Sequence, residues 1–197
     1  MIPKDLQNYQ IILASKSPRR HSLLKEMGLV FSVQTKNTDE KFPPKLQGAE
    51  IVQYLCKQKA DAFKQEDLPQ NFLLITADTI VTAHGEVLNK AADAAEATDM
   101  LQKLSGCNHR VITGICLRSS DKQQFFYDEA EVQFAKLLPD EIQYYVQQFQ
   151  PFDKAGAYGI QEWIGLIGIE AIKGSYFTVM GLPTFQLWQE LKHFIKQ

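Results

Sequence analysis

Ser15-Lys16-Ser17-Pro18-Arg19-Arg20 combines small hydroxyl side chains with two adjacent guanidinium groups. It follows the apolar run Ile11–Ala14, which predicts a short strand, and it opens a helix predicted over Ser17–Met27. The first N–H groups of a helix lack intrahelical partners and attract anions, and arginine forks match phosphate oxygens. We therefore expect a phosphate-binding turn, with Ser17 as helix cap and Pro18 as the first helical residue. The alternative is a surface helix start with two solvated arginines.

Asp78 is the second residue with chemical potential, because it stands inside the apolar run Leu73–Ala83, which predicts a strand. Aspartate is a poor strand former, and burial of an unpaired carboxylate is costly. A conflict between a residue and its local structure is expected at functional sites. Asp78 is therefore a candidate for a paired or metal-bound carboxylate. The alternative is a structural aspartate that accepts backbone hydrogen bonds from a neighbouring loop.

Two lysines and an acidic pair could complete a polyphosphate site. Lys59 falls on the inward stripe of a helix predicted over Ala49–Gln65, although a lysine there can also extend its stem to solvent. Lys90 follows the hairpin that begins at Asp78, so the returning chain is expected to bring it near that carboxylate. Asp39-Glu40 lies in a polar loop. Near Asp78 this pair could hold a divalent ion with hard oxygen ligands, and alone it is a solvated pair.

The segment Phe152–Gln161 is rich in glycine and alanine, which let the backbone approach a flat ligand closely. Gln161 carries a donor and an acceptor, which suits the edge of a nucleobase, although many such loops are only turns. The chain has no GxxxxGK[ST] motif and no GxGxxG after a strand. A P-loop fold is thereby excluded, and dinucleotide binding is not supported.

The composition excludes several classes of protein. Hydrophobic residues make up 45% of the chain, charged residues 22%, and the net charge is -2, which is unlike a general nucleic-acid binder. No apolar stretch approaches the roughly 20 residues that span a membrane, and Met1–Asp5 lacks the pattern of a signal peptide. The three cysteines are widely spaced without a CxxC pair, which argues against a zinc knuckle and favours a reducing cytoplasm. The four histidines form no local metal motif.

Strand-like and helix-like segments alternate, which predicts a mixed α/β fold in a single domain over residues 1–197, divided into two lobes. The further predicted strands are Phe31–Thr35, Glu86–Leu88, Val111–Leu117 and Tyr127–Phe134. The further predicted helices are Asp93–Ser105, Pro139–Phe149 and Pro183–Lys196. Trp163–Ala171 and Ser175–Met180 are expected to form a β-hairpin.

Three motifs in this order resemble the Maf family of nucleoside triphosphate pyrophosphatases: Ala14–Arg20, Ala77–Val81 and Asp153–Gln161. The resemblance extends from Ile11 to the Gly181-Leu182-Pro183 turn. It implies an elongated mixed β-sheet with flanking helices and two lobes around a central cleft, similar to the inosine-triphosphate pyrophosphatases. It also implies a cytoplasmic enzyme with a divalent cation, Mg²⁺ or Mn²⁺, that frequently forms a homodimer. The expected partner is a nucleoside triphosphate, with no nucleic acid and no membrane.

The resemblance also implies roles for individual residues. Phosphate-handling positions fall on Ser15, Arg20, Lys59 and Lys90, and metal-proximal acids fall on Glu40 and Asp78, with Asp78 as general base. The segment Asp153–Gln161, which we call the late loop, looks like that of the subgroup acting on dTTP and UTP. In that subgroup, positions matching Arg19, Thr79 and Gln161 select the base. Lys16, where the family often has glycine, departs from the pattern.

The activity implied is hydrolysis of dTTP and UTP to the monophosphate and pyrophosphate, by metal-assisted attack of water on the α-phosphorus. One alternative is a pyrophosphatase for modified nucleotides such as 7-methyl-GTP. The other is a nucleotide-binding regulator of septum formation.

Overall fold

The computed structural model describes residues 3–196. Residues 1, 2 and 197 of the predicted domain, and with them the start of the segment Met1–Asp5, lie outside the described residues. The chain forms two compact units. Unit 1 comprises Met1–Asp78, Thr113–Asp128 and Gly181–Gln197, and unit 2 comprises Thr79–Ile112 and Glu129–Met180.

The predicted mixed α/β class is confirmed. Seven strands form one sheet in the order β2-β1-β3-β5-β6-β7, with β4 paired to β3. The strands β3 (Phe72–Ala83), β5 (Asn108–Arg118) and β6 (Gln123–Phe134) each contribute residues to both units. The sheet is mixed because β1 pairs in parallel with β2 and β3, whereas β4 and β7 pair antiparallel with β3 and β6.

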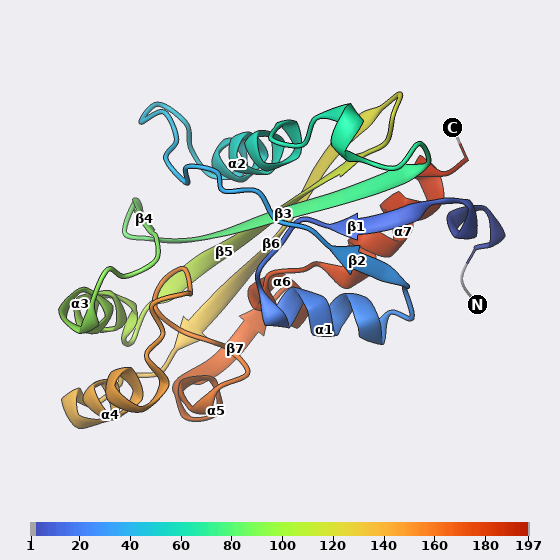
Figure 1. The fold of residues 1–197 in the computed structure, drawn as a ribbon. Coiled ribbons are helices and arrows are strands. Elements are labelled where there is room, and N and C mark those ends of the chain that lie inside the picture. The colour runs from blue at the N-terminus through green and yellow to red at the C-terminus, as the bar shows by residue number, and fades with distance from the viewer. Residues whose placement is uncertain (1–2, 197) are drawn as a thin grey trace. The chain divides into compact units, whose positions relative to one another are not determined.

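Unit 1 is built on the parallel strands at one end of the sheet. Its other elements are the 3-10 helices η1 (Lys4–Asn8) and η2 (Gln65–Asp67), the strands β1 (Gln10–Leu13) and β2 (Phe31–Val33), and the helices α1 (Pro18–Glu26), α2 (Ala49–Asp61) and α7 (Thr184–Phe194). Ile12 pairs with Leu74, and both pack with Cys56 of α2 in one buried cluster. Helix α2 covers this face, and α1 lies on the opposite face of β1 and β3 (Figure 1). Burial of both faces explains the continuous apolar runs of these strands.

Unit 2 surrounds a separate core. Its own elements are β4 (Glu86–Leu88), α3 (Ala94–Leu104), α4 (Pro139–Phe149), α5 (Trp163–Gly168), β7 (Ile169–Lys173) and α6 (Tyr176–Met180). Leu101 of α3, Tyr145 of α4 and Ile164 of α5 are fully buried in one cluster, and α3 and α4 lie side by side (Figure 1). Asp93 caps α3, because the Glu96 N–H donates to Asp93 Oδ1 at 2.9 Å.

The hairpin predicted over Trp163–Ala171 and Ser175–Met180 is wrong. The structure has helix α5, strand β7 and helix α6 there, and β7 pairs with β6 rather than with its own neighbour. A short apolar run has no clear periodicity, so a helix and a strand look alike in it. Gly165 permits the tight turn into α5, since a Cβ there would lie 1.9 Å from the Ile160 carbonyl oxygen.

The other predicted elements are present, and most of them have shifted ends. The helix predicted to Gln65 ends at Asp61 and is followed by η2. His84 and Gly85 form the turn between β3 and β4, and both have positive φ, as a tight hairpin turn requires. Among residues 3–196, no helix has the length and apolar character needed to cross a membrane.

Candidate functional site

The turn between β1 and α1 carries the first group of predicted residues. Pro18 begins α1 and Ser17 is its N-cap residue, as predicted, but the Ser17 side chain makes no capping hydrogen bond. The Ser17 N–H instead donates to Ser15 Oγ at 3.2 Å, and Ser15 is buried. The hydroxyl of Ser15, rather than that of Ser17, therefore holds the turn before α1. Arg19 and Arg20 follow in the first turn of the helix.

The guanidinium of Arg20 is held by backbone carbonyls of unit 1. Its Nε donates to Gly181 O at 2.8 Å, and its Nη1 donates to Ala77 O at 2.9 Å and to Ser15 Oγ at 3.4 Å. Burial lowers the pKa of Arg20, and the nearby Asp78 partly opposes that shift. Arg20 therefore joins the start of α1 to the peptide that precedes Asp78. This contribution to the structure was not expected from the sequence.

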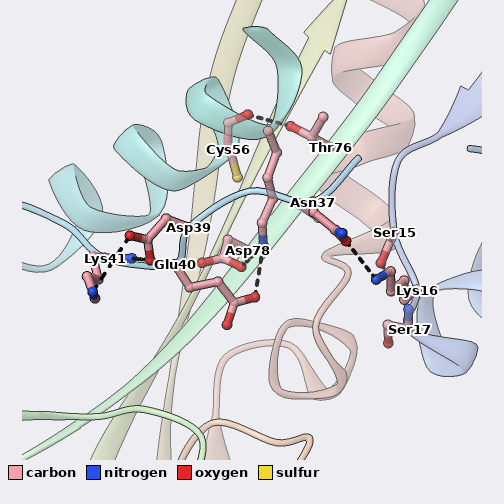
Figure 2. A network of polar contacts seen from close by, with 12 residues as sticks. Ser15, Lys16, Ser17, Asn37, Asp39, Glu40, Lys41, Cys56, Thr76 and Asp78 are labelled. Atoms are coloured by element: carbon pink, nitrogen blue, oxygen red, sulfur yellow. Dashed lines mark hydrogen bonds and ion pairs between the residues drawn. The ribbon is translucent and has the colours of Figure 1, made fainter. Parts of the chain in front are cut away.

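Asp78 forms an ion pair with Lys59 of α2. Lys59 Nζ lies 2.5 Å from Asp78 Oδ1, and only 16% and 13% of the two side chains are exposed. The Lys59 side chain therefore points inward rather than extending to solvent. The same ammonium lies 3.7 Å from Glu40 Oε1, and the Glu40 side chain is 48% exposed. Figure 2 shows Glu40 and Asp78 turned toward the same region.

The loop before α2 presents Glu40, and not its neighbour, to this cluster. Asp39 accepts the Lys41 N–H and pairs with the Lys41 side chain, so its carboxylate is engaged by Lys41 (Figure 2). The same loop is tied to the Ser15–Arg20 turn, because Lys16 Nζ donates to Asn37 Oδ1 at 3.2 Å. Lys16, which departs from the family pattern, thus supports the loop that carries Glu40.

The two carboxylates fit a divalent cation. They already converge on one positive group, the Lys59 ammonium, and carboxylate oxygens are the hard ligands that Mg²⁺ and Mn²⁺ prefer. Within residues 3–196 there is no group of three or more histidine, cysteine, aspartate or glutamate side chains that could hold a metal. An ion on Glu40 and Asp78 would therefore need further ligands from water and from a phosphate. This is the usual way in which proteins bind Mg²⁺.

Unit 2 carries the other three predicted site residues. Thr79 lies on β3, directly after Asp78 in the sequence. Lys90 lies beyond β4, where the chain leaves the β3 ladder and forms a bridge with Ala155. Gln161 is exposed in the turn that precedes α5. The Gly156 N–H donates to Leu88 O at 3.0 Å, so the segment that ends at Gln161 packs against the end of β4.

A buried polar network that the sequence did not predict braces this late loop. Lys154 Nζ lies 2.7 Å from Asp153 Oδ1 and 3.1 Å from Glu162 Oε1, with 8% of the Lys154 side chain exposed. The Tyr145 hydroxyl donates to Glu162 and accepts the Gly159 N–H at 3.0 Å. The network fixes both ends of the segment that leads to Gln161. The signal in the sequence was Lys154, a charged residue next to a run of small residues. Like Asp78 in its apolar strand, it differs in type from its neighbours.

The fold and the cluster of Lys59, Asp78 and Glu40 define a class of protein. It is an α/β protein in which a helix with a basic first turn lies in the same unit as a lysine that contacts two acidic side chains. The chain belongs to the Maf-like protein family, whose model matches residues 10–194, so the predicted family is confirmed. A dTTP/UTP pyrophosphatase of Bacteroides thetaiotaomicron is 49% identical over 189 residues, which cover 95% of this chain and 97% of that protein.

Two further relatives carry the same name. The dTTP/UTP pyrophosphatase of Flavobacterium psychrophilum is 50% identical over 188 residues, covering 95% of this chain and 96% of its own length. That of Cytophaga hutchinsonii is 50% identical over 192 residues, covering 98% of this chain and 87% of its own length. The similarity thus extends over both units.

Proposed function

We propose that this protein is a nucleoside triphosphate pyrophosphatase that hydrolyses dTTP and UTP to the monophosphate and pyrophosphate. Membership of the Maf-like family and the name shared by its relatives support this activity. The structural observation that carries the proposal is the position of Asp78. It is a largely shielded carboxylate, held by Lys59 beside Glu40 in the same unit as the Ser15–Arg20 turn.

In the proposed reaction, Asp78 acts as the general base. It accepts a proton from water while the water oxygen forms a bond to the α-phosphorus. The bond between the α-phosphorus and the bridging oxygen to the β-phosphorus breaks, and pyrophosphate leaves with that electron pair. Lys59 holds the Asp78 carboxylate through an ion pair, with Nζ 2.5 Å from Oδ1.

Glu40 and Asp78 would hold a divalent cation, which when bound supplies charge neutralisation for the phosphate oxygens. The remaining work falls to groups of this chain. Ser15 and Arg20 shape the turn at the start of α1, whose helix dipole favours a phosphate. Lys59 adds a positive charge close to the general base, and such electrostatic positioning dominates phosphoryl transfer.

Four roles rest on the family resemblance alone. In unit 2 they are phosphate binding by Lys90 and base selection by Thr79 and Gln161, and in unit 1 the role is base selection by Arg19. A cytoplasmic location and a homodimer are also part of the proposal. The three cysteines are free thiols, which agrees with a reducing compartment.

The test is a substrate panel with the purified full-length protein. dTTP, UTP, CTP and 7-methyl-GTP are incubated with Mg²⁺, with Mn²⁺ or with chelator, and pyrophosphate and monophosphate are measured separately. We expect equal amounts of the two products from dTTP and UTP. In ¹⁸O-labelled water the label should enter the monophosphate, because water attacks the α-phosphorus.

Three results would count against the proposal. Release of orthophosphate, or label in the pyrophosphate, would contradict attack at the α-phosphorus. A strong preference for 7-methyl-GTP would favour the enzyme for modified nucleotides. Absence of pyrophosphate with every nucleotide and both metals would favour a binding role without catalysis.

A further inference from the structure

Thr76 is a fully buried polar residue next to the candidate site, and the proposed mechanism does not use it. Its hydroxyl donates to the carbonyl oxygen of Cys56, in the middle of α2, at 2.8 Å (Figure 2). That carbonyl lies inside the helix, where it also accepts the ordinary intrahelical hydrogen bond. The Thr76 hydroxyl therefore supplies a second hydrogen bond, whose effect is to hold the helix against the strand.

The contact from Thr76 and the Lys59–Asp78 pair are consecutive contacts between the same two elements. Side chains of a strand alternate, so Thr76 and Asp78 of β3 point to the same face. Cys56 and Lys59 are three residues apart in α2 and share one face of that helix. The first contact is made by a short threonine side chain to a backbone carbonyl, whereas the second depends on a long, flexible lysine side chain. The distance between helix and strand at Thr76 thus limits where the Lys59 ammonium can lie.

Helix α2 has little freedom to move on the sheet at this position. Cys56 Sγ donates to Gly114 O of β5 at 3.2 Å, and burial raises the pKa of this thiol. A Cβ on Gly114 would lie 2.9 Å from the side chain of Val52, which shows how closely the helix approaches the sheet. Next to this close packing, the Thr76 hydroxyl adds a polar contact between β3 and α2, two residues before Asp78.

We propose that Thr76 is a positioning residue, which fixes α2 on β3 so that Lys59 holds the Asp78 carboxylate in its productive orientation. This inference rests on the proposed function, in which Asp78 is the general base. Thr76 itself contacts neither substrate nor the reacting atoms. It acts through Lys59, and that dependence separates it from a residue that only stabilises the fold.

The first test compares Thr76→Val, which has nearly the same shape without the hydroxyl, with Thr76→Ser, which keeps the hydroxyl. With dTTP we expect the valine variant to lose about 10-fold in kcat, because small misplacements of catalytic groups are expensive, while KM changes less than about twofold. The serine variant should recover most of the loss. Thr178→Val removes another fully buried threonine hydroxyl, in unit 2, and should leave kcat unchanged.

The second test asks whether Thr76 acts through Lys59. In a Lys59→Met background, Thr76→Val should lower kcat by less than about twofold, because interacting residues are not additive. A full 10-fold loss in that background would overturn the proposal. A valine variant that melts at a lower temperature but keeps wild-type kcat would overturn it as well.

A third measurement does not depend on activity. The coupling between Lys59→Met and Asp78→Asn in the free energy of unfolding is measured with Thr76 present and again with Thr76→Val. The proposal expects the coupling to fall when the hydroxyl is absent, and an unchanged coupling would contradict it. This result stands even if no nucleotide is hydrolysed, so failure of the proposed function and failure of this inference are distinguishable.

Discussion

Lys59 and Asp78 form an ion pair across 19 residues of sequence, with Nζ and Oδ1 2.5 Å apart and both side chains largely shielded from water. The pair joins α2 to β3, and Glu40 approaches it from the loop before α2. The pair joins two elements, and it also places the Asp78 carboxylate beside that of Glu40.

The first prediction concerns Lys59. Lys59→Met leaves Asp78 and Glu40 without their shared positive charge, and we expect the free energy of unfolding to fall by about 2 kcal/mol, less than for a fully buried pair. The turnover of dTTP should fall by about 10²-fold. Urea denaturation and steady-state kinetics measure the two effects. Lys41→Met is the matched control, because Lys41 forms an exposed pair with Asp39 and its loss should change stability little.

The second prediction concerns Arg20. Arg20→Lys keeps the charge but cannot donate to Gly181 O and Ala77 O in the same fork geometry. We expect a loss of about 1–2 kcal/mol in the free energy of unfolding, together with reduced kcat, since the peptide before Asp78 loses its support. Arg110→Lys, at an exposed pair with Glu129, is the control and should cost much less. Equal effects of the two substitutions on stability and kcat would contradict this role of Arg20.

The third prediction concerns the pH dependence of stability. His109 is buried, its Nε2 lies 2.8 Å from the Tyr158 hydroxyl, and within residues 3–196 its Nδ1 has no hydrogen-bond partner. Burial lowers the pKa of His109 to about 4, below the ordinary value of 6.5. Between these two values the unfolded chain binds a proton that the folded chain does not bind. Stability is therefore lost as the pH falls from about 6.5 to about 4, by about 3 kcal/mol in total.

The measurement for His109 is urea unfolding at several pH values between 4 and 7. His109→Gln removes the titrating group and should flatten this part of the stability profile. His193→Gln, at an exposed position in α7, should leave the slope of the wild-type protein unchanged. An unchanged slope in His109→Gln would show that another group causes the acid sensitivity.

The fourth prediction concerns the brace of the late loop. Glu162→Gln removes the charge that balances Lys154 and weakens the hydrogen bond from Tyr145. We expect the free energy of unfolding to fall by about 2 kcal/mol. If Gln161 selects the base, the preference for UTP over CTP should also decrease, because Gln161 directly precedes Glu162. A double-mutant cycle with Tyr145→Phe should show coupling, and additive effects would rule out a shared network.

The residues of unit 1 that matter most could be found in the sequence because each breaks a local rule. Asp78 is a carboxylate in an apolar strand, and Lys59 is a cation on the inward face of a helix. Their pairing could not be predicted, because it depends on how α2 packs on β3, and the Thr76–Cys56 hydrogen bond between these elements joins residues that are 20 apart in sequence. The carbonyl partners of Arg20 depend on tertiary structure in the same way.

The fold was predicted well where periodicity or end signals were strong. Helix α4 begins and ends at the predicted residues, since Pro139 starts it and its apolar positions follow helical spacing. The segment Trp163–Met180 was not predicted correctly, because its short apolar runs fit a helix and a strand equally well. The metal, the homodimer and the functional roles of all the candidate site residues stay predictions.

The most direct test of the central claim is the turnover of dTTP by Asp78→Asn, a substitution that keeps the shape of the side chain and removes the base. We expect kcat to fall by about 10³-fold, while calorimetry shows that dTTP still binds. Asp39→Asn, an exposed acid on the loop that carries Glu40, should retain wild-type turnover. An Asp78→Asn enzyme with the turnover of the wild-type protein would contradict the assignment of Asp78 as the general base.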